Sequence, residues 1–146
     1  MGAAHLMHVV LDTNILFSGL ISQKASPHQI WEAWRAGRFE LVTCSIQLEE
    51  IRRASRYPEF QNVLKPHLVG RMVNHLKRAV IMDELSDDHE SEDPGDSWLL
   101  ALAEASQADY LVTGDKRAGL LSRRRIGPTR IMTAAAFCRT ALHEGR

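Results

Sequence analysis

The 146-residue sequence lacks the features that mark several large protein classes. It has only two cysteines, Cys44 and Cys138, which lie far apart in apolar surroundings. This excludes a disulfide framework and a paired-cysteine metal site, and it suits a reducing compartment. The seven histidines are scattered and form no H-E-x-x-H motif, so we do not expect a zinc enzyme.

Net charge and long apolar runs are missing as well. The formal net charge is +0, so no global field draws the protein towards nucleic acid, and any such binding must come from local patches. No apolar run approaches the ~20 residues that a membrane-spanning helix needs. The stretch Met1–Met7 has neither the basic region nor the apolar core of a signal peptide. We therefore expect a cytoplasmic protein without membrane contact.

Apolar strands and amphipathic helices alternate along the chain, with no repeat, linker or low-complexity segment between them. This pattern predicts an α/β fold: a three-layer α/β/α sandwich around a central, mainly parallel sheet of four to five strands. We expect residues 1–6 to be an N-terminal extension and residues 7–146 to form one domain. The predicted strands are 9–11, 39–44, 79–82, 110–113 and 130–132, the last of them an edge strand.

The strongest chemical signal is an acid at the end of the first strand. Val9–Leu11 runs into Asp12 without polar alternation, as a strand buried on both faces does. A carboxylate there lies at the carboxyl edge of the sheet, where open α/β folds keep their ligand crevices. Thr13 and Asn14 then favour a helix start, and the alternative interpretation is that Asp12 only caps that helix.

A second strand ends in the same way. Tyr110–Thr113 is apolar and leads to Gly114 and Asp115, and Gly114 permits a tight turn. Because the carboxyl ends of parallel strands meet at one edge, Asp115 should lie on the same side of the sheet as Asp12.

Two more acids stand near the starts of predicted helices. Ile46, Glu50 and Ala54 are spaced i, i+4, i+8, which predicts that Glu50 lies on an inward row. Its neighbour Glu49 should be at the surface and pair with Arg53.

The other helical acid is Asp96, which precedes Leu99, Leu100 and Ala103 at the spacing of a buried helix face. The alternative is an acid favoured by the helix N-terminus, for which Asp93 is better placed. The remaining acids from Asp83 onwards should form a hydrated loop.

Four carboxylates at one edge repel one another unless a cation compensates. Hard divalent cations prefer oxygen ligands, and Mg²⁺ or Mn²⁺ fits this set best. A site of this kind suits phosphodiester hydrolysis. The expected catalytic and metal-binding residues are Asp12, Glu50, Asp96 and Asp115.

Three blocks of the sequence resemble, in order and at similar spacing, the successive motifs of PIN-domain nucleases: VVLDTNILFSGLIS, SIQLEEIRRASRYPEF and DPGDSWLLALAEASQADYLVTGDKRAGLL. The resemblance runs from Met7 to the final helix and is closest to the prokaryotic toxins of toxin–antitoxin pairs. It implies a PIN-like fold and a metal-dependent endoribonuclease that acts on RNA, with an antitoxin or a second copy of the chain as protein partner.

The resemblance also implies roles for single residues. Asp12 matches the first acid, Glu50 the helix acid, Asp96 the acid of the D-P-x-D block and Asp115 the acid of T-G-D. The polar residues expected to support these acids or their waters are Asn14, Ser45, Thr113 and Asp93.

A basic segment follows Asp115, and we expect it to carry RNA past the acids because phosphate contacts dominate such binding. The alternative is a solubilising surface loop. Its cations are Lys116, Arg117, Arg123, Arg124 and Arg125.

Other functions fit the sequence less well. A phosphatase of the haloacid dehalogenase type needs a second acid where Asn14 stands, and a response-regulator receiver needs a paired acid and a late lysine that are absent. A catalytically silent PIN-like module that binds RNA or protein, or a PIN nuclease of RNA processing, remains an alternative. Retention of all four acids favours activity.

Overall fold

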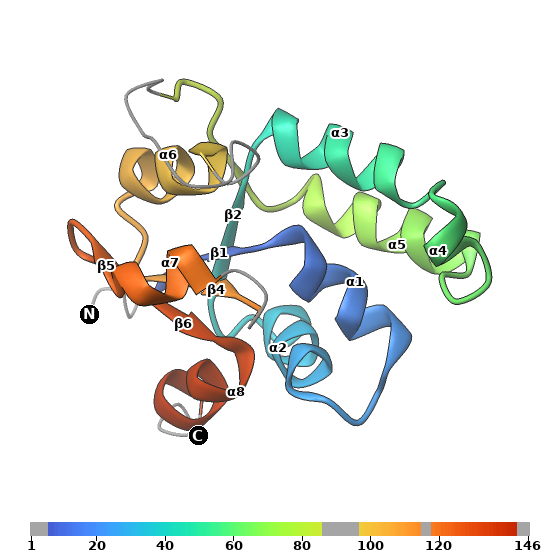
Figure 1. Ribbon diagram of the computed structural model, residues 1–146, viewed down its shortest axis with the longest axis horizontal. Helices are drawn as coiled ribbons and strands as arrows, with labels where there is room; N and C mark the ends of the chain where they lie inside the picture. The colour runs from blue at the N-terminus through green and yellow to red at the C-terminus, as the bar shows by residue number, and fades with distance from the viewer. Residues whose placement is uncertain (1–5, 86–96, 115–117, 143–146) are drawn as a thin grey trace.

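The computed structural model describes residues 6–85, 97–114 and 118–142. Within these ranges the strands form one sheet of six, in the order β3-β2-β1-β4-β6-β5, with helices on both faces (Figure 1). The neighbouring pairs are parallel except β5 with β6. The α/β class and the mainly parallel sheet are therefore as predicted.

The strands are short. They are β1 (His8–Leu11), β2 (Glu40–Thr43), β3 (Val80–Ile81), β4 (Tyr110–Thr113), β5 (Arg125–Ile126) and β6 (Thr129–Thr133). The helices are α1 (Thr13–Ile21), α2 (Ser26–Arg35), α3 (Ser45–Ala54), α4 (Pro58–Gln61), α5 (Pro66–Leu76), α6 (Ser97–Ser106), α7 (Ala118–Arg123) and α8 (Ala134–Phe137), which continues as a π-helical turn, η2 (Cys138–Leu142).

Apolar residues on successive strand positions bury both faces of the sheet. Val9 and Leu11 pack into a core that includes residues of α1, α2, α3, α5 and α8. Val10 and Val42 face the opposite core, which α6 and α7 cover. Figure 1 shows this division, with α6 on one side of β1 and β2 and the α1–α2 pair on the other. The uninterrupted apolar run before Asp12 is thus the signature of a strand buried on both sides.

The sheet differs from the prediction at its far side. The strand predicted at 130–132 was expected at the edge, but β6 pairs with β4 on one side and with β5 on the other. The edge strand is β5, which a two-residue turn with Gly127 at φ +55° joins to β6. The basic segment is likewise not a simple loop, because α7 precedes β5. A two-residue strand and a one-and-a-half-turn helix are too short to show a hydrophobic period.

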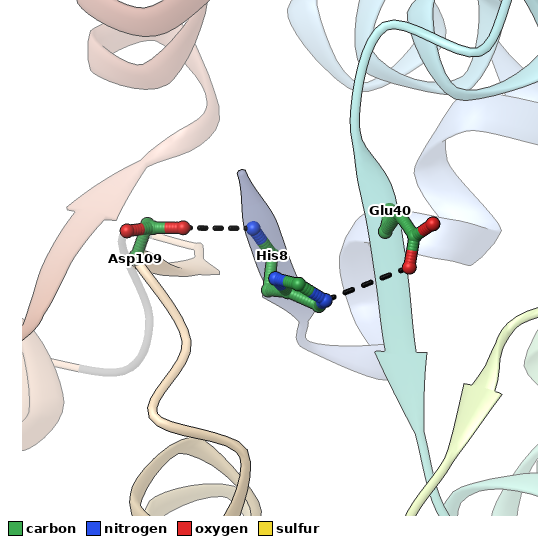
Figure 2. Close-up of polar contacts among 3 residues, drawn as sticks. All are labelled: His8, Glu40 and Asp109. Atoms are coloured by element: carbon green, nitrogen blue, oxygen red, sulfur yellow. Dashed lines mark hydrogen bonds and ion pairs between the residues drawn. The ribbon is translucent and has the colours of Figure 1, made fainter. Parts of the chain in front are cut away.

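The amino end of β1 is held between its two neighbours. The backbone N–H of His8 donates to Asp109 Oδ2 at 2.8 Å, and the ring Nε2 lies 3.5 Å from Glu40 Oε2 (Figure 2). The Asp109 N–H donates in return to the His8 carbonyl at 2.8 Å. These contacts support the register of the central strand, in which Leu11 is level with Val112, so that Asp12 follows β1 beside Thr113 at the end of β4.

Helices α1 and α2 approach closely where α1 has a glycine. A Cβ built on Gly19 would lie 3.0 Å from the Pro27 carbonyl oxygen and 3.6 Å from Trp31 Cβ. The Gly19 carbonyl also lies 3.1 Å from His28 Nδ1. The α1–α2 hairpin therefore depends on the missing side chain.

Replacement of this glycine should destabilise the fold, although alanine is the better helix former by about 0.5–1 kcal/mol. We expect Gly19→Ala to lower the free energy of unfolding by about 1–3 kcal/mol through overpacking. The matched control is Gly70→Ala in α5, where the new Cβ meets nothing within 4 Å and should be neutral or stabilising. Urea denaturation of both variants measures the difference, and equal stabilities would contradict it.

Candidate active site at the carboxyl edge of the sheet

Asp12 follows β1 at the centre of the sheet and is buried, with 1% of its surface exposed. Its Oδ2 accepts a hydrogen bond of 2.8 Å from the Thr113 hydroxyl at the end of β4. Its Oδ1 accepts a longer one, 3.4 Å, from the Asn14 N–H, so Asp12 is also the N-cap of α1. The capping alternative is correct as geometry, but burial and the contact from β4 go beyond what a cap requires.

The strand order places Asp12 where the connections diverge. From β1 the chain crosses through α1 and α2 to β2 on one side, while β4 lies on the other. In open parallel sheets such a switch point leaves a crevice outside the carboxyl ends of the strands, and ligands bind there.

Beneath Asp12 lies a buried polar network that the sequence did not indicate. The Thr43 hydroxyl donates to Gln47 Oε1 at 2.6 Å, and Gln47 Nε2 donates to the Leu11 carbonyl at 2.7 Å. The same Nε2 lies 3.4 Å from the Thr13 hydroxyl. Gln47 is fully buried and joins β1, β2, α1 and α3 around the residues on either side of Asp12. The sequence could have indicated this network only through Gln47, a polar residue on the row of α3 that is buried in the structure.

The predicted phase of α3 needs correction. Ile46 is 47% exposed, and the buried residues of the helix are Gln47, Ile51 and Ala54. Glu50 lies beside this row and is half-buried, whereas Glu49 is exposed. Glu50 is therefore the inward glutamate, as expected. Of the apolar residues expected on its row, Ala54 is buried but Ile46 is not. No ion pair joins Glu49 to Arg53, both of which the structure describes.

Glu50 lines a cavity of about 430 Å³ between α1, α3 and α4. Thr13 and Asn14, the two residues after Asp12, form part of its wall. Asn14 lies between the two acids of the predicted set that the structure describes. Its backbone N–H donates to Asp12, and Asn14 lines the same cavity as Glu50.

Ser45 was expected to support the acids, but its contacts are elsewhere. Its N–H and hydroxyl donate to the two carboxylate oxygens of Asp83, at 2.7 and 2.8 Å. Asp83, which was expected only to be part of a hydrated loop, therefore accepts hydrogen bonds from the first residue of α3. It lies two residues after the end of β3. The backbone bond from Ser45, then the hydroxyl bond, lower the pKa of Asp83.

The three arginines that precede β6 lie in different settings. Arg123 ends α7, Arg124 has φ +63°, and Arg125 begins β5. Arg125 pairs with Arg130, which pairs with Tyr110, the first residue of β4. Arg125 is thus level with the amino ends of the strands, about 10 Å below the edge that carries Asp12. The expectation that this segment leaves the Asp12 edge is wrong for Arg125.

Comparison with protein families decides how this geometry is interpreted. A family model described as the PIN domain matches residues 8–117. The chain belongs to the PIN-domain family. PIN domains are generally nucleases, they typically use divalent metal ions, and they commonly bind RNA. A search of curated proteins found no match.

The other predicted residues of this PIN domain fall outside what the structure describes. These are Asp93, Asp96, Asp115, Lys116 and Arg117. Their described neighbours are Ser97, the first residue of α6, and Gly114, which follows β4. In the described ranges no three His, Cys, Asp or Glu side chains gather into a metal site. Across the same ranges, no helix is long and apolar enough to cross a membrane.

The donors at the carboxyl edge of this PIN domain suit a hard cation. Asp12 offers carboxylate oxygens, and the Thr113 hydroxyl oxygen lies 2.8 Å from one of them. Glu50 and Asn14, which also carry oxygen donors, line the adjoining cavity. Zn²⁺ prefers softer donors such as thiolates. Cys44, which directly follows β2, is buried, and burial raises the pKa of its thiol. A protonated thiol is a poor metal ligand. The set therefore fits Mg²⁺ or Mn²⁺ rather than Zn²⁺.

The network under Asp12 should be costly to remove. Gln47→Leu keeps the volume but leaves the Leu11 carbonyl and the Thr43 hydroxyl without this partner. We expect the free energy of unfolding to fall by about 1–3 kcal/mol. The control is Gln29→Leu on the exposed side of α2, and urea denaturation compares the two. A loss at Gln47 no larger than at Gln29 would show that the network contributes nothing.

The Asp83–Ser45 contact predicts a pH dependence of stability. Because the pKa of Asp83 is lowered below its ordinary 3.8, its contribution is complete above that value and is lost as pH falls through the lower, folded-state pKa. The stability advantage of the wild type over Asp83→Asn should therefore shrink below about pH 4. Denaturation at several pH values measures it, with Glu84→Gln as the control. An advantage that stays constant with pH would contradict the assignment.

Proposed function

We propose that the chain is a divalent-metal-dependent endoribonuclease that hydrolyses RNA phosphodiester bonds. The observation that carries this is the buried Asp12 carboxylate at the switch point of a PIN-domain sheet, with Glu50 on the adjoining cavity. A buried carboxylate in such a crevice, held by hydrogen bonds, is suited to bind a cation at a fixed position.

In this proposal Mg²⁺ or Mn²⁺ is held by Asp12, Glu50, Asp96 and Asp115, the last two assigned from their sequence positions. When bound, the ion would supply activated water and charge stabilisation at phosphorus. The chain's own residues orient the site: the Thr113 hydroxyl donates to one oxygen of Asp12. Gln47 holds the backbone carbonyl of Leu11 before Asp12 and lies 3.4 Å from the side-chain hydroxyl of Thr13 after it. Loss of such a contact to a metal-binding residue typically lowers metal affinity or activity about 10- to 100-fold.

Cations must offset the acids before RNA can approach. Lys116, Arg117 and Arg123 remain our candidates, and Arg124 and Arg125 take a secondary place because Arg125 is level with the other end of the sheet.

The biological role proposed is that of the toxin in a toxin–antitoxin pair, acting in the cytoplasm. The three motif blocks that resemble this group support it. Its partners would be the RNA substrate, an antitoxin protein and, in a homodimer, a second copy of the chain. Loss of RNA cleavage on co-expression with the product of the adjacent gene would support the assignment, and unaffected cleavage would argue for RNA processing instead.

The central test is cleavage of mixed single-stranded RNA with Mg²⁺ or Mn²⁺. Asp12→Asn and Glu50→Gln should each lower the rate by more than about 100-fold, because they remove metal ligands rather than outer contacts. The matched control is Glu49→Gln, which changes the adjacent, exposed glutamate and should stay within about twofold.

Excess EDTA should abolish the activity, and re-addition of Mn²⁺ should restore it. Full cleavage in EDTA would exclude the metal mechanism. An inactive Glu49→Gln beside an active Glu50→Gln would reverse the assignment of the two glutamates.

A further inference from the structure

The cavity beside Glu50 is large enough to bind a ligand of its own. Its volume of about 430 Å³ falls in the range of small-molecule sites. We propose that it receives the base of a single-stranded RNA nucleotide adjacent to the cleaved phosphate, with Tyr57 as the stacking residue. This inference rests on the proposed ribonuclease function and names its substrate class.

Two residues of the cavity lining, Phe17 and Phe60, form an aromatic pair. Phe17 is buried, and its ring centroid lies 5.0 Å from that of Phe60 at an interplanar angle of 54°. Tilted aromatic pairs at this distance are favourable, so the two rings stabilise each other without a ligand. An incoming ring would therefore meet a preformed surface.

Tyr57 lines this cavity and is 42% exposed, so part of its side chain is open to solvent. Its backbone is fixed on both sides: its N–H donates to the Ala54 carbonyl at 3.0 Å, and its carbonyl accepts from the Phe60 N–H at 2.9 Å. Pro58 then begins α4 and restricts the chain further. An exposed aromatic ring on a fixed backbone is a platform for stacking a base.

The charges of the lining favour a base over a phosphate. Two acids, Glu50 and Glu59, face the cavity together with one cation, Arg53. This balance does not attract an anion. Carboxyl groups accept hydrogen bonds from the amino and imino groups of bases, while a guanidinium group donates to their carbonyl oxygens or stacks on their rings.

The location links the cavity to the chemistry. Glu50 belongs to both the predicted acid set and the lining, and Asn14 contacts Asp12 while it borders the cavity. A nucleotide whose base lies in the cavity would direct its phosphate towards the sheet edge. In a duplex the bases are stacked and paired, so a cavity of this kind accepts only single-stranded RNA.

Equilibrium binding tests the proposal without cleavage. Fluorescence anisotropy in EDTA at low salt would measure the affinity of the full chain for a short single strand with all four bases, and for the corresponding duplex. Tyr57→Ala should weaken single-strand binding about 5- to 150-fold, the range for loss of one stacked base. Tyr57→Phe, which keeps the ring, should stay within about twofold.

A matched control replaces another exposed apolar side chain. Ile81, on β3, is 45% exposed and is not part of the cavity lining, so Ile81→Ala should leave RNA affinity unchanged. Thermal denaturation checks that each variant is folded. Unchanged single-strand affinity in Tyr57→Ala, or an equal loss for the duplex, would overturn the proposal.

A second measurement separates this inference from the function on which it rests. The substrates are RNA single strands that each lack one base, with the abasic position moved along the series. The wild type should cut one of these substrates more slowly than the others, the one that lacks the base bound in the cavity. Tyr57→Ala should cut all of them at similar rates. Tyr57-dependent binding without metal-dependent cleavage would support the base site and refute the ribonuclease function. Cleavage that is equally insensitive to abasic positions in both proteins would refute the base site alone.

Discussion

A carboxylate removed from water must have hydrogen-bond partners, and the site depends on how Asp12 obtains them. One donor, Asn14, is two residues away and would be present in any helix that Asp12 capped. Another donor, Thr113, is 101 residues away and is brought close by the parallel pairing of β1 with β4. The fold therefore presents Asp12 in one orientation. Pairing at the other end of β1, through His8 and Asp109, maintains the register on which this contact relies.

The surroundings of Asp12 divide into a rigid base and an accessible wall. Gln47 and Thr43 join β1, β2 and α3 in a fully buried network below the acid. The cavity with Glu50 and Tyr57 lies beside it, between helices rather than within the sheet. A fixed ligand set suits metal binding, because small displacements of catalytic groups are costly. An adjoining open cavity would suit recognition of a substrate that varies in sequence, which is the role proposed for it above.

Several details of the site could not be read from the sequence, each for a physical reason. The phase of α3 was misjudged because Ile46 is apolar yet exposed, and a single exposed apolar residue is common on protein surfaces. Ser45 was assigned to the acids, but its partner is Asp83, 38 residues away, and no local pattern indicates such a pairing. The basic residues near β5 were placed together, whereas the hairpin takes Arg125 to the opposite end of the sheet.

The sequence alone determined the alternation of strands and helices, the buried first strand and the acid at its end. These follow from hydrophobic period and from residue order, which act over a few residues and are visible in the chain itself. Tertiary structure decided which groups meet: Thr113 with Asp12, and Gln47 with Leu11. It also decided that Glu50 shares a cavity with residues of α1 and α4. Such meetings depend on strand order, register and helix rotation. These are set by packing over the whole domain, because a shift of one residue in a strand, or of a fraction of a turn in a helix, changes every contact without changing the local pattern.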